Sequence, residues 1–333
     1  MSNAKQILAL LRSRAEGDED SFFSIALQVA AAEARQGHRQ IADELRSEID
    51  RARARTSRGQ SVAIPFSTPR GNLEGLLEHR APRFTLKDVV LNDQLVTRID
   101  DILRQQRKRD WLREHGKTPS RLLLLVGPPG SGKTMSSEAL AGELHLPLYV
   151  IRLEAMITRY MGETAAKLRL IFDETSKRRG VYLFDEFDAV GGHRTASNDV
   201  AEMRRVLNSF LQFMEESNST DSLIVCSTNY PKLLDRALLR RFDQVLEFDP
   251  PTAQQIKKLI SANLGKMKIQ KADWKAIIAA AKDLSQSEIV RATDDAVKTA
   301  ILDERIDLTT TDVLDRLRER LKMRSAFLES KGA

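Results

Sequence analysis

The stretch Leu122–Thr134, LLLLVGPPGSGKT, constrains the fold more than any other part of the chain. Its first five residues are apolar without alternation, which is typical of a strand buried on both faces of a parallel sheet. Glycines follow at once and let backbone N–H groups point inward at phosphate oxygens, and good helix formers begin at Met135. Strand, loop and helix in this order predict a phosphate-binding loop rather than a Gly-rich turn that matches by chance.

The loop also predicts roles for its residues. Lys133 can reach the outer phosphates, the Thr134 hydroxyl can serve Mg²⁺, and the helix adds its positive end. We therefore expect bound ATP or GTP to contact Gly127, Pro128, Pro129, Gly130, Ser131, Gly132, Lys133, Thr134 and Met135.

Further apolar runs predict an α/β fold. Four of them, separated by helical stretches, follow the first helix: Leu148–Ile151, Val181–Phe184, Leu223–Cys226 and Val245–Phe248. This alternation predicts a P-loop NTPase three-layer αβα domain with a mainly parallel five-stranded sheet. Beyond Pro251 the pattern becomes purely helical, over about 253–264, 272–282, 285–302 and 311–322.

These patterns divide the chain into four segments. Residues 1–56 are expected to form a helical hairpin or three-helix module for docking or oligomer packing, with a specific nucleic-acid function as the alternative. Residues 57–83, rich in Ser, Gly and Pro, are expected to be a linker. The α/β domain is expected at 84–250 and a C-terminal helical domain at 251–333.

Composition narrows the setting of the protein. The 333 residues contain one cysteine, Cys226, which excludes intrachain disulfides and fits a reducing cytoplasm. No apolar run approaches the roughly 18 residues of a membrane span, and no signal peptide is evident. The net charge of +6 permits nucleic-acid contact without demanding it, because much of the Lys and Arg lies on amphipathic helices.

Two acids end one of the predicted strands, where Asp185 and Glu186 follow Val181–Phe184. In a P-loop enzyme an acid at this strand tip holds Mg²⁺ through water, and the next acid can polarise the attacking water. An apolar run before two acids is weak evidence alone but strong beside the phosphate loop. We assign Asp185, with Thr134, to the metal and Glu186 to the general base.

Several motifs together resemble the AAA ATPases in the strict sense, the branch that includes katanin, spastin and the proteasomal motors. They are GPPGSGKT, LFDEFDAVGGHR, STNYPKLLDRALLRRFD and the helical tail, and the likeness covers about residues 84–322. The resemblance is to a bacterial-type protein with a single ATPase cassette. It implies Mg²⁺-dependent ATP hydrolysis in a homo-hexameric ring, with the C-terminal domain as a lid.

The resemblance also implies roles for individual residues. Asn229 matches the sensor that positions the attacking water, with a turn-forming Asn as the alternative. Arg240 and Arg241 match the arginine fingers that reach the γ-phosphate held by the next subunit, with an ordinary surface pair as the alternative. Val89 and Val90 stand where the family packs adenine, although the usual Gly-bearing element is absent.

Two loops resemble the pore loops of the family. Tyr160 and Met161 match the first, whose aromatic ring grips an extended polypeptide; a tyrosine capping a surface helix is the alternative. His193 and Arg194 stand in place of the second, where a solvated loop fits equally well. In the lid, Gln286 replaces a glycine of the family, and Arg291 is a remote candidate for nucleotide sensing.

The leading functional hypothesis is an ATP-driven protein remodeller that threads a polypeptide substrate through its own ring. Similar small bacterial AAA ATPases are encoded beside a subtilisin-like serine protease in mobile-element and phage-defence settings, so such a protease is a candidate partner. A nucleic-acid loader is the first alternative, disfavoured by Tyr160 and the finger pair. An ATP-gated scaffold without turnover is the second, disfavoured by the intact acids and Arg241.

Overall fold

The computed structural model describes Ala26, Leu73 and residues 75–153, 161–187, 197–216, 220–230 and 239–329, without the side chains of 161–162, 197–205 and 327–329. The chain divides into two units, Met1–Phe66 and Ser67–Ala333, and the fold below belongs to the second. The predicted docking module lies outside the described residues except for Ala26, as do Tyr160, His193 and Arg194.

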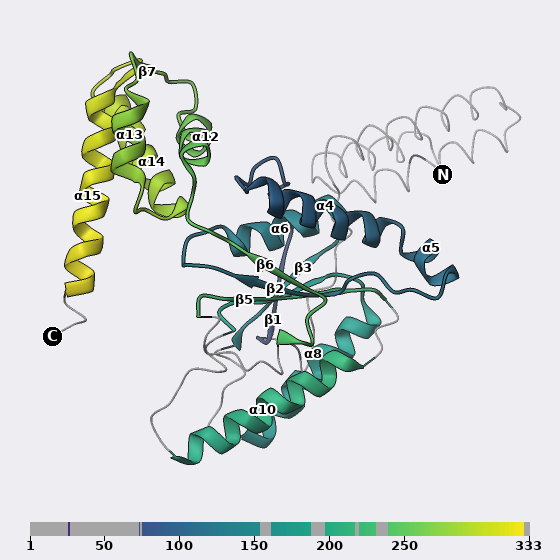
Figure 1. Cartoon of the computed structure of the whole chain (residues 1–333). Helices are drawn as coiled ribbons and strands as arrows, with labels where there is room; N and C mark the ends of the chain where they lie inside the picture. Colours follow the sequence, from purple (N-terminus) through teal and green to yellow (C-terminus); the bar gives the residue numbers. More distant parts are fainter. Residues whose placement is uncertain are drawn as a thin grey trace, which may run out of the picture. The chain divides into compact units, whose positions relative to one another are not determined.

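A six-stranded sheet forms the centre of the second unit (Figure 1), in the order β1-β3-β4-β5-β2-β6. Its strands are β1 (Leu77–Arg80), β2 (Leu122–Val126), β3 (Leu148–Ile151), β4 (Val181–Phe184), β5 (Leu223–Thr228) and β6 (Gln244–Glu247). The pairs from β3 to β6 are parallel, and β1 runs antiparallel to β3. The predicted α/β class with a mainly parallel sheet is confirmed.

Strand β1 corrects two predictions, the count of five strands and the linker extending to residue 83. Leu77 lies opposite Ile151, and Leu76 and Leu77 are buried in the core beneath the sheet. Only two apolar residues precede Glu78, so the pattern is too short to reveal a strand. The sheet edge instead arises from pairing with β3, which is a tertiary contact.

Helices cover both faces of the sheet (Figure 1). They are α4 (Asp93–Arg107) and α6 (Lys133–Leu144) on one face, and α8 (Met161–Lys177) and α10 (Ser197–Glu215) on the other. Successive side chains of β2 alternate between the faces: Leu123 and Leu125 belong to the core with α4 and α6, and Leu122 and Leu124 to the other. This double burial explains the unbroken apolar run.

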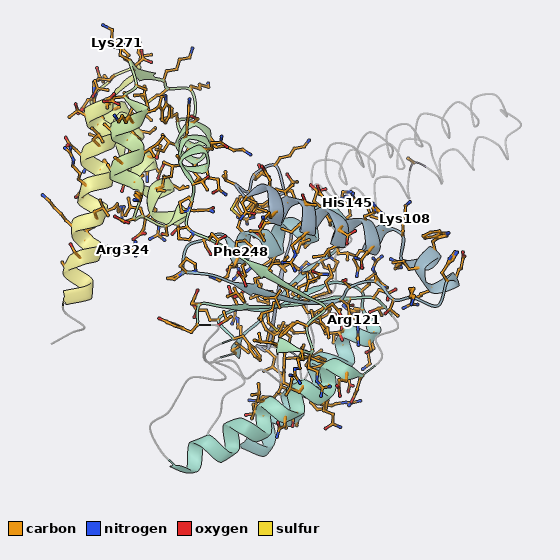
Figure 2. The ribbon with its side chains drawn as sticks, viewed as in Figure 1. Lys108, Arg121, His145, Phe248, Lys271 and Arg324 are labelled. Carbon is orange, nitrogen blue, oxygen red and sulfur yellow. The ribbon has the colours of Figure 1, made fainter. Side chains whose placement is uncertain are left out.

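The helical segment that precedes β2 is divided in two. Its first helix, α4, ends at Arg107, and α5 (Arg109–Glu114) begins after Lys108, whose backbone is not helical. None of the residues of α5 is buried, so no apolar periodicity marked the break. Figure 2 labels Lys108 at this break, and it also labels Phe248, whose N–H donates to the carbonyl oxygen of Val126 at the end of β2.

The C-terminal bundle consists of α12 (Ala253–Asn263), α13 (Trp274–Ala281), α14 (Gln286–Leu302) and α15 (Thr310–Glu329). It has its own core, with Ile260, Ile277 and Ile289 fully buried. The predicted purely helical pattern is wrong at two points, because β7 (Ile269–Gln270) and β8 (Leu308–Thr309) pair in parallel. Two-residue strands carry no periodic signal.

Capping boxes fix where two helices of the bundle begin. The Ser285 hydroxyl accepts from the N–H of Glu288, whose carboxylate accepts from Ser285 in return, and Thr252 with Gln255 does the same for α12. The first residues of α14 therefore have a defined place. Among the helices of the described ranges, none is both long and apolar enough to cross a membrane.

Candidate functional site

The loop after β2 owes its shape to two glycines. A Cβ on Gly127 would lie 2.5 Å from the carbonyl oxygen of Phe248, so only glycine fits beside the end of β6. Gly130 has φ +75°, a left-handed conformation that side chains disfavour. The loop then passes directly into α6, which begins at Lys133.

Lys133 ties the loop to the end of β5. Its side chain is buried, and Nζ donates to the carbonyl oxygens of Gly127 (2.8 Å) and Pro128 (2.9 Å). The same ammonium donates to Oδ1 of Asn229 at 2.8 Å. The structure thus brings together two residues predicted from motifs that lie 96 positions apart in the sequence.

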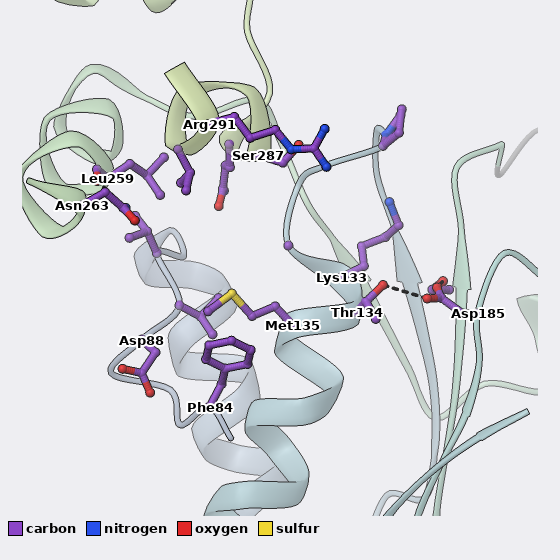
Figure 3. A pocket seen from close by; sticks show the side chains of 18 of the residues that line it. Phe84, Asp88, Lys133, Thr134, Met135, Asp185, Leu259, Asn263, Ser287 and Arg291 are labelled. Atoms are coloured by element: carbon purple, nitrogen blue, oxygen red, sulfur yellow. Dashed lines mark hydrogen bonds between the residues drawn. The ribbon is translucent and has the colours of Figure 1, made fainter. Parts of the chain in front are cut away.

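Thr134 and Asp185 meet beside the same loop. The Thr134 hydroxyl donates to Oδ2 of Asp185 at 2.8 Å, the contact drawn as a dashed line in Figure 3. Hydroxyl and carboxylate oxygens are ligands that suit Mg²⁺, which proteins commonly bind through one or two carboxylates together with substrate phosphates. This donor set fits the predicted metal. The described residues contain no group of three or more His, Cys, Asp or Glu that could hold a metal without phosphate.

A cavity of about 620 Å³ collects these groups. It is lined by Phe84, Asp88, Val89, Val90, Pro129, Gly130, Gly132, Lys133, Thr134, Met135, Asp185, Glu186, Ser227, Asn229, Leu259, Ala262, Asn263, Gln286, Ser287, Val290 and Arg291. Its size is that of a small-molecule or cofactor site. Of the predicted nucleotide-contact residues, Gly127, Pro128 and Ser131 are not in this lining, and Ser131 is buried.

The predicted adenine-packing residues lie at the apolar end of the cavity. Val89 and Val90 are 5% and 6% exposed; Val89 belongs to a core of the sheet, and Val90 to the core of the C-terminal bundle. The turn before them is closed by Asp88, whose carboxylate accepts from the N–H and the hydroxyl of Thr85. These hydrogen bonds lower the pKa of Asp88, so the carboxylate that holds the turn stays ionised.

The C-terminal bundle forms the opposite wall. The N–H of Ser287 donates to the carbonyl oxygen of Gly130 at 3.0 Å, which joins α14 to the phosphate loop. Gln286 is largely buried at this junction, and Arg291 lies one turn further along the helix (Figure 3). On α12, the Asn263 amide donates to the carbonyl oxygen of Leu259 at 2.8 Å.

The predicted arginine fingers lie elsewhere. Arg240 and Arg241 are exposed and do not line the cavity. Arg241 forms an ion pair with Glu215, the last residue of α10. The structure therefore does not bring the pair to the site of its own chain, and their role stays a prediction. Met161 is the first residue of α8.

Several lining residues were missed from the sequence. They are Phe84, Asp88, Ser227, Leu259, Ala262, Asn263 and Val290. Ser227 carried a usable signal, because it is a polar residue in a strand end that already contained Asn229. The others are ordinary residues of helices and turns, and only the fold brings them to the cavity.

Together these features define a class. A phosphate loop opening on a helix, with an acid at the tip of a nearby parallel strand, is the site of a P-loop nucleoside triphosphatase. The family model described as "ATPase family associated with various cellular activities (AAA)" matches residues 123–250. An uncharacterised AAA family ATPase of Sinorhizobium fredii, y4kL, is 31% identical over 93% of this chain and 93% of its own. The chain belongs to the AAA family of ATPases, as its motifs predicted, and it is an ATP-hydrolysing enzyme.

Two further proteins are similar to part of this chain. The ATP-dependent zinc metalloprotease FtsH of Rickettsia felis is 33% identical over 68% of this chain, which spans only 36% of that protein. The crystal structure of the FIGL-1 AAA domain matches with a TM-score of 0.61, 18% identity, 81% of this chain and 98% of that chain, which is a likeness of fold. Family membership supports ATP-driven remodelling in general terms.

Proposed function

We propose that this ATPase threads polypeptide through a homo-hexameric ring, hydrolysing ATP at sites shared between neighbouring subunits. The observation that carries the proposal is the division of the predicted catalytic groups. Lys133, Asp185, Glu186 and Asn229 line one cavity, whereas Arg241 is exposed outside it. Arg291 lines the cavity from the C-terminal bundle, but neither predicted finger does, and an arginine finger can be supplied in trans by a second protein chain.

Each residue of the cavity has a proposed task. Thr134 and Asp185 would hold Mg²⁺, which would supply positive charge to stabilise the charge that develops on the phosphates. Lys133 exchanges loop carbonyls for phosphate oxygens when ATP binds. Glu186 polarises the attacking water, and Asn229, already held beside Lys133, orients it.

A trans site makes a prediction about mixtures. Arg241→Ala is expected to lower kcat by about 10³-fold while each subunit still binds ATP, because the guanidinium stabilises charge only in the transition state. Mixing Arg241→Ala with Glu186→Gln, two inactive variants, should restore hydrolysis wherever an intact finger meets an intact base. ATP turnover of the mixture measures this restoration.

The control is Glu215→Ala, which breaks the ion pair of Arg241 and leaves the guanidinium in place. It should keep the activity of the natural protein. Full activity of Arg241→Ala alone, or no recovery in any mixture that forms rings, would contradict catalysis between subunits.

Threading depends on the proposed pore residues Tyr160 and Met161. Tyr160→Ala is expected to keep most of the ATP hydrolysis and to abolish unfolding of a tagged protein. The reason is that the aromatic face of Tyr160 grips the substrate but takes no part in the chemistry. Tyr160→Phe serves as the control because it keeps that face. Continued unfolding by the Ala variant would refute threading by this loop.

A subtilisin-like serine protease is the proposed receiver of the unfolded chain. The support is an analogy with FtsH, which is named an ATP-dependent zinc metalloprotease and so combines ATP dependence with proteolysis. Co-purification of such a protease with ATP-bound Glu186→Gln rings tests the partnership.

A further inference from the structure

Ser227 is a buried polar residue that the proposed chemistry leaves without a task. It lies near the end of β5, two residues before Asn229, and is 1% exposed. It faces the turn that follows β4, where the two acids stand.

The hydroxyl of Ser227 is used twice by protein groups. It donates to Oδ1 of Asp185, and it accepts the N–H of Glu186 at 3.2 Å, an N–H that is shared with Oδ1 of Asp185 at 3.2 Å. The other oxygen of Asp185, Oδ2, accepts from Thr134. Both oxygens of this carboxylate are therefore held, one by the phosphate-loop helix and one by β5, which fixes the plane of the carboxylate.

The backbone of Glu186 needs support. Its φ of +52° is left-handed, which is uncommon for a residue other than glycine and persists where surrounding contacts impose it. The next residue, Phe187, donates its N–H to the carbonyl oxygen of Ser227 at 2.8 Å, and its ring packs on Phe210 at 4.7 Å between centroids. The hydroxyl and the carbonyl of one serine thus hold both ends of the Glu186 turn.

We infer that Ser227 is a positioning residue for ATP hydrolysis: its hydroxyl holds the Asp185 carboxylate and the Glu186 backbone in the arrangement that the reaction requires. It acts through these two residues, because the donor of its hydroxyl is committed to Asp185. The inference rests on the proposed roles of the two acids. Removing the hydroxyl leaves the hydrogen bond from Phe187 to the Ser227 carbonyl in place. The turn should therefore keep its backbone path, while the Asp185 carboxylate and the Glu186 backbone are held less tightly.

The test compares two buried serines at opposite ends of the same strand. Ser227→Ala is expected to lower kcat about tenfold, the effect of one hydrogen bond, with the KM for ATP unchanged. Ser227→Thr, which restores a hydroxyl, should recover most of that loss. Ser222→Ala is the matched control. Ser222 directly precedes β5 and is also fully buried, and its hydroxyl lies within hydrogen-bonding distance of the carbonyl oxygens of Thr175 and Arg178. Ser222→Ala should lower the melting temperature by about as much as Ser227→Ala does, and it should leave kcat unchanged.

Amide hydrogen exchange supplies a readout that needs neither nucleotide nor activity. The N–H of Glu186 should exchange faster in Ser227→Ala than in the natural protein, and at the natural rate in Ser222→Ala. An unchanged kcat together with unchanged exchange in Ser227→Ala would overturn the inference.

A double-mutant cycle separates positioning from general stability. In a Glu186→Gln background, Ser227→Ala should lower the single-turnover rate by much less than tenfold, because one of the two groups that it positions is already disabled. A further tenfold fall would mean that Ser227 acts independently of Glu186 and would overturn the inference. Full activity of Glu186→Gln itself would instead remove the proposed base, and the exchange rates would still decide whether the hydroxyl holds the turn.

Discussion

The two walls of the nucleotide cavity differ in how their polar groups are held. On the wall formed by the strand ends, Lys133 is buried against three acceptors, and both oxygens of Asp185 are engaged. On the wall formed by the C-terminal bundle, the hydrogen bond from Ser287 to Gly130 joins α14 to the loop, and Ser287 itself is exposed. One wall is preorganised by side-chain contacts at the strand ends, and the other is joined to the phosphate loop through a backbone hydrogen bond.

Preorganisation of this kind is what catalysis requires, because groups that are already oriented cost no reorganisation when charge develops. Binding is less demanding, since a mobile wall can close on a ligand after it arrives. We therefore expect changes on the strand wall to act on kcat and changes on the bundle wall to act on affinity.

Of the changes to the two walls, Glu186→Gln on the strand wall should have the largest effect. Replacing the proposed general base should lower kcat by about 100-fold or more while ATP affinity is kept, because the amide fills the same space without accepting a proton. Steady-state hydrolysis and equilibrium binding of a fluorescent ATP analogue measure the two quantities. Glu247→Gln is the control, since Glu247 is exposed at the end of β6 and does not line the cavity.

Undiminished turnover by Glu186→Gln would contradict the base assignment. A loss of affinity equal to the loss of kcat would break the comparison, because the strand wall would then be a binding surface like its counterpart.

A smaller effect, of the opposite kind, is expected from Arg291→Ala. If the guanidinium meets phosphate from the bundle wall, its loss should weaken ATP binding by about tenfold, the size of a charge-assisted hydrogen bond, with kcat at saturating ATP little changed. Titration of the fluorescent analogue measures the affinity.

Arg318→Ala is the matched control, because Arg318 is an exposed arginine of α15 that does not line the cavity. Equal losses of affinity in both variants would mean a general effect of charge. An unchanged affinity in Arg291→Ala would show that this wall does not read the phosphates.

The same contrast explains what could be predicted from the sequence. The polar residues of the strand wall come from contiguous sequence motifs. Lys133 and Thr134 are neighbours, and Asp185 and Glu186 directly follow a buried strand. Their chemistry depends on local order, so parallel strands with their carboxyl ends together were enough to place them near one another. Their meeting in one cavity is what the structure adds.

The rest depends on tertiary contacts that leave little trace in the sequence. Strand β1 is too short to show the alternation of a strand. The break at Lys108 is followed by α5, which has no buried residues and so no apolar pattern. Leu259 and Asn263 are ordinary residues of an amphipathic helix until the bundle packs. Ser227 could have been singled out, but its contacts with Asp185 and Glu186 could not, because those two residues follow a different strand.

The neighbouring residues Val89 and Val90 have a mechanical consequence. Each is anchored in a different hydrophobic core, and consecutive Cα atoms across a trans peptide are about 3.8 Å apart. The two cores therefore cannot translate away from each other at this point without pulling one valine into water. A relative movement that keeps both anchors is a rotation about this short tether, with the largest displacement at the part of the bundle farthest from Val90.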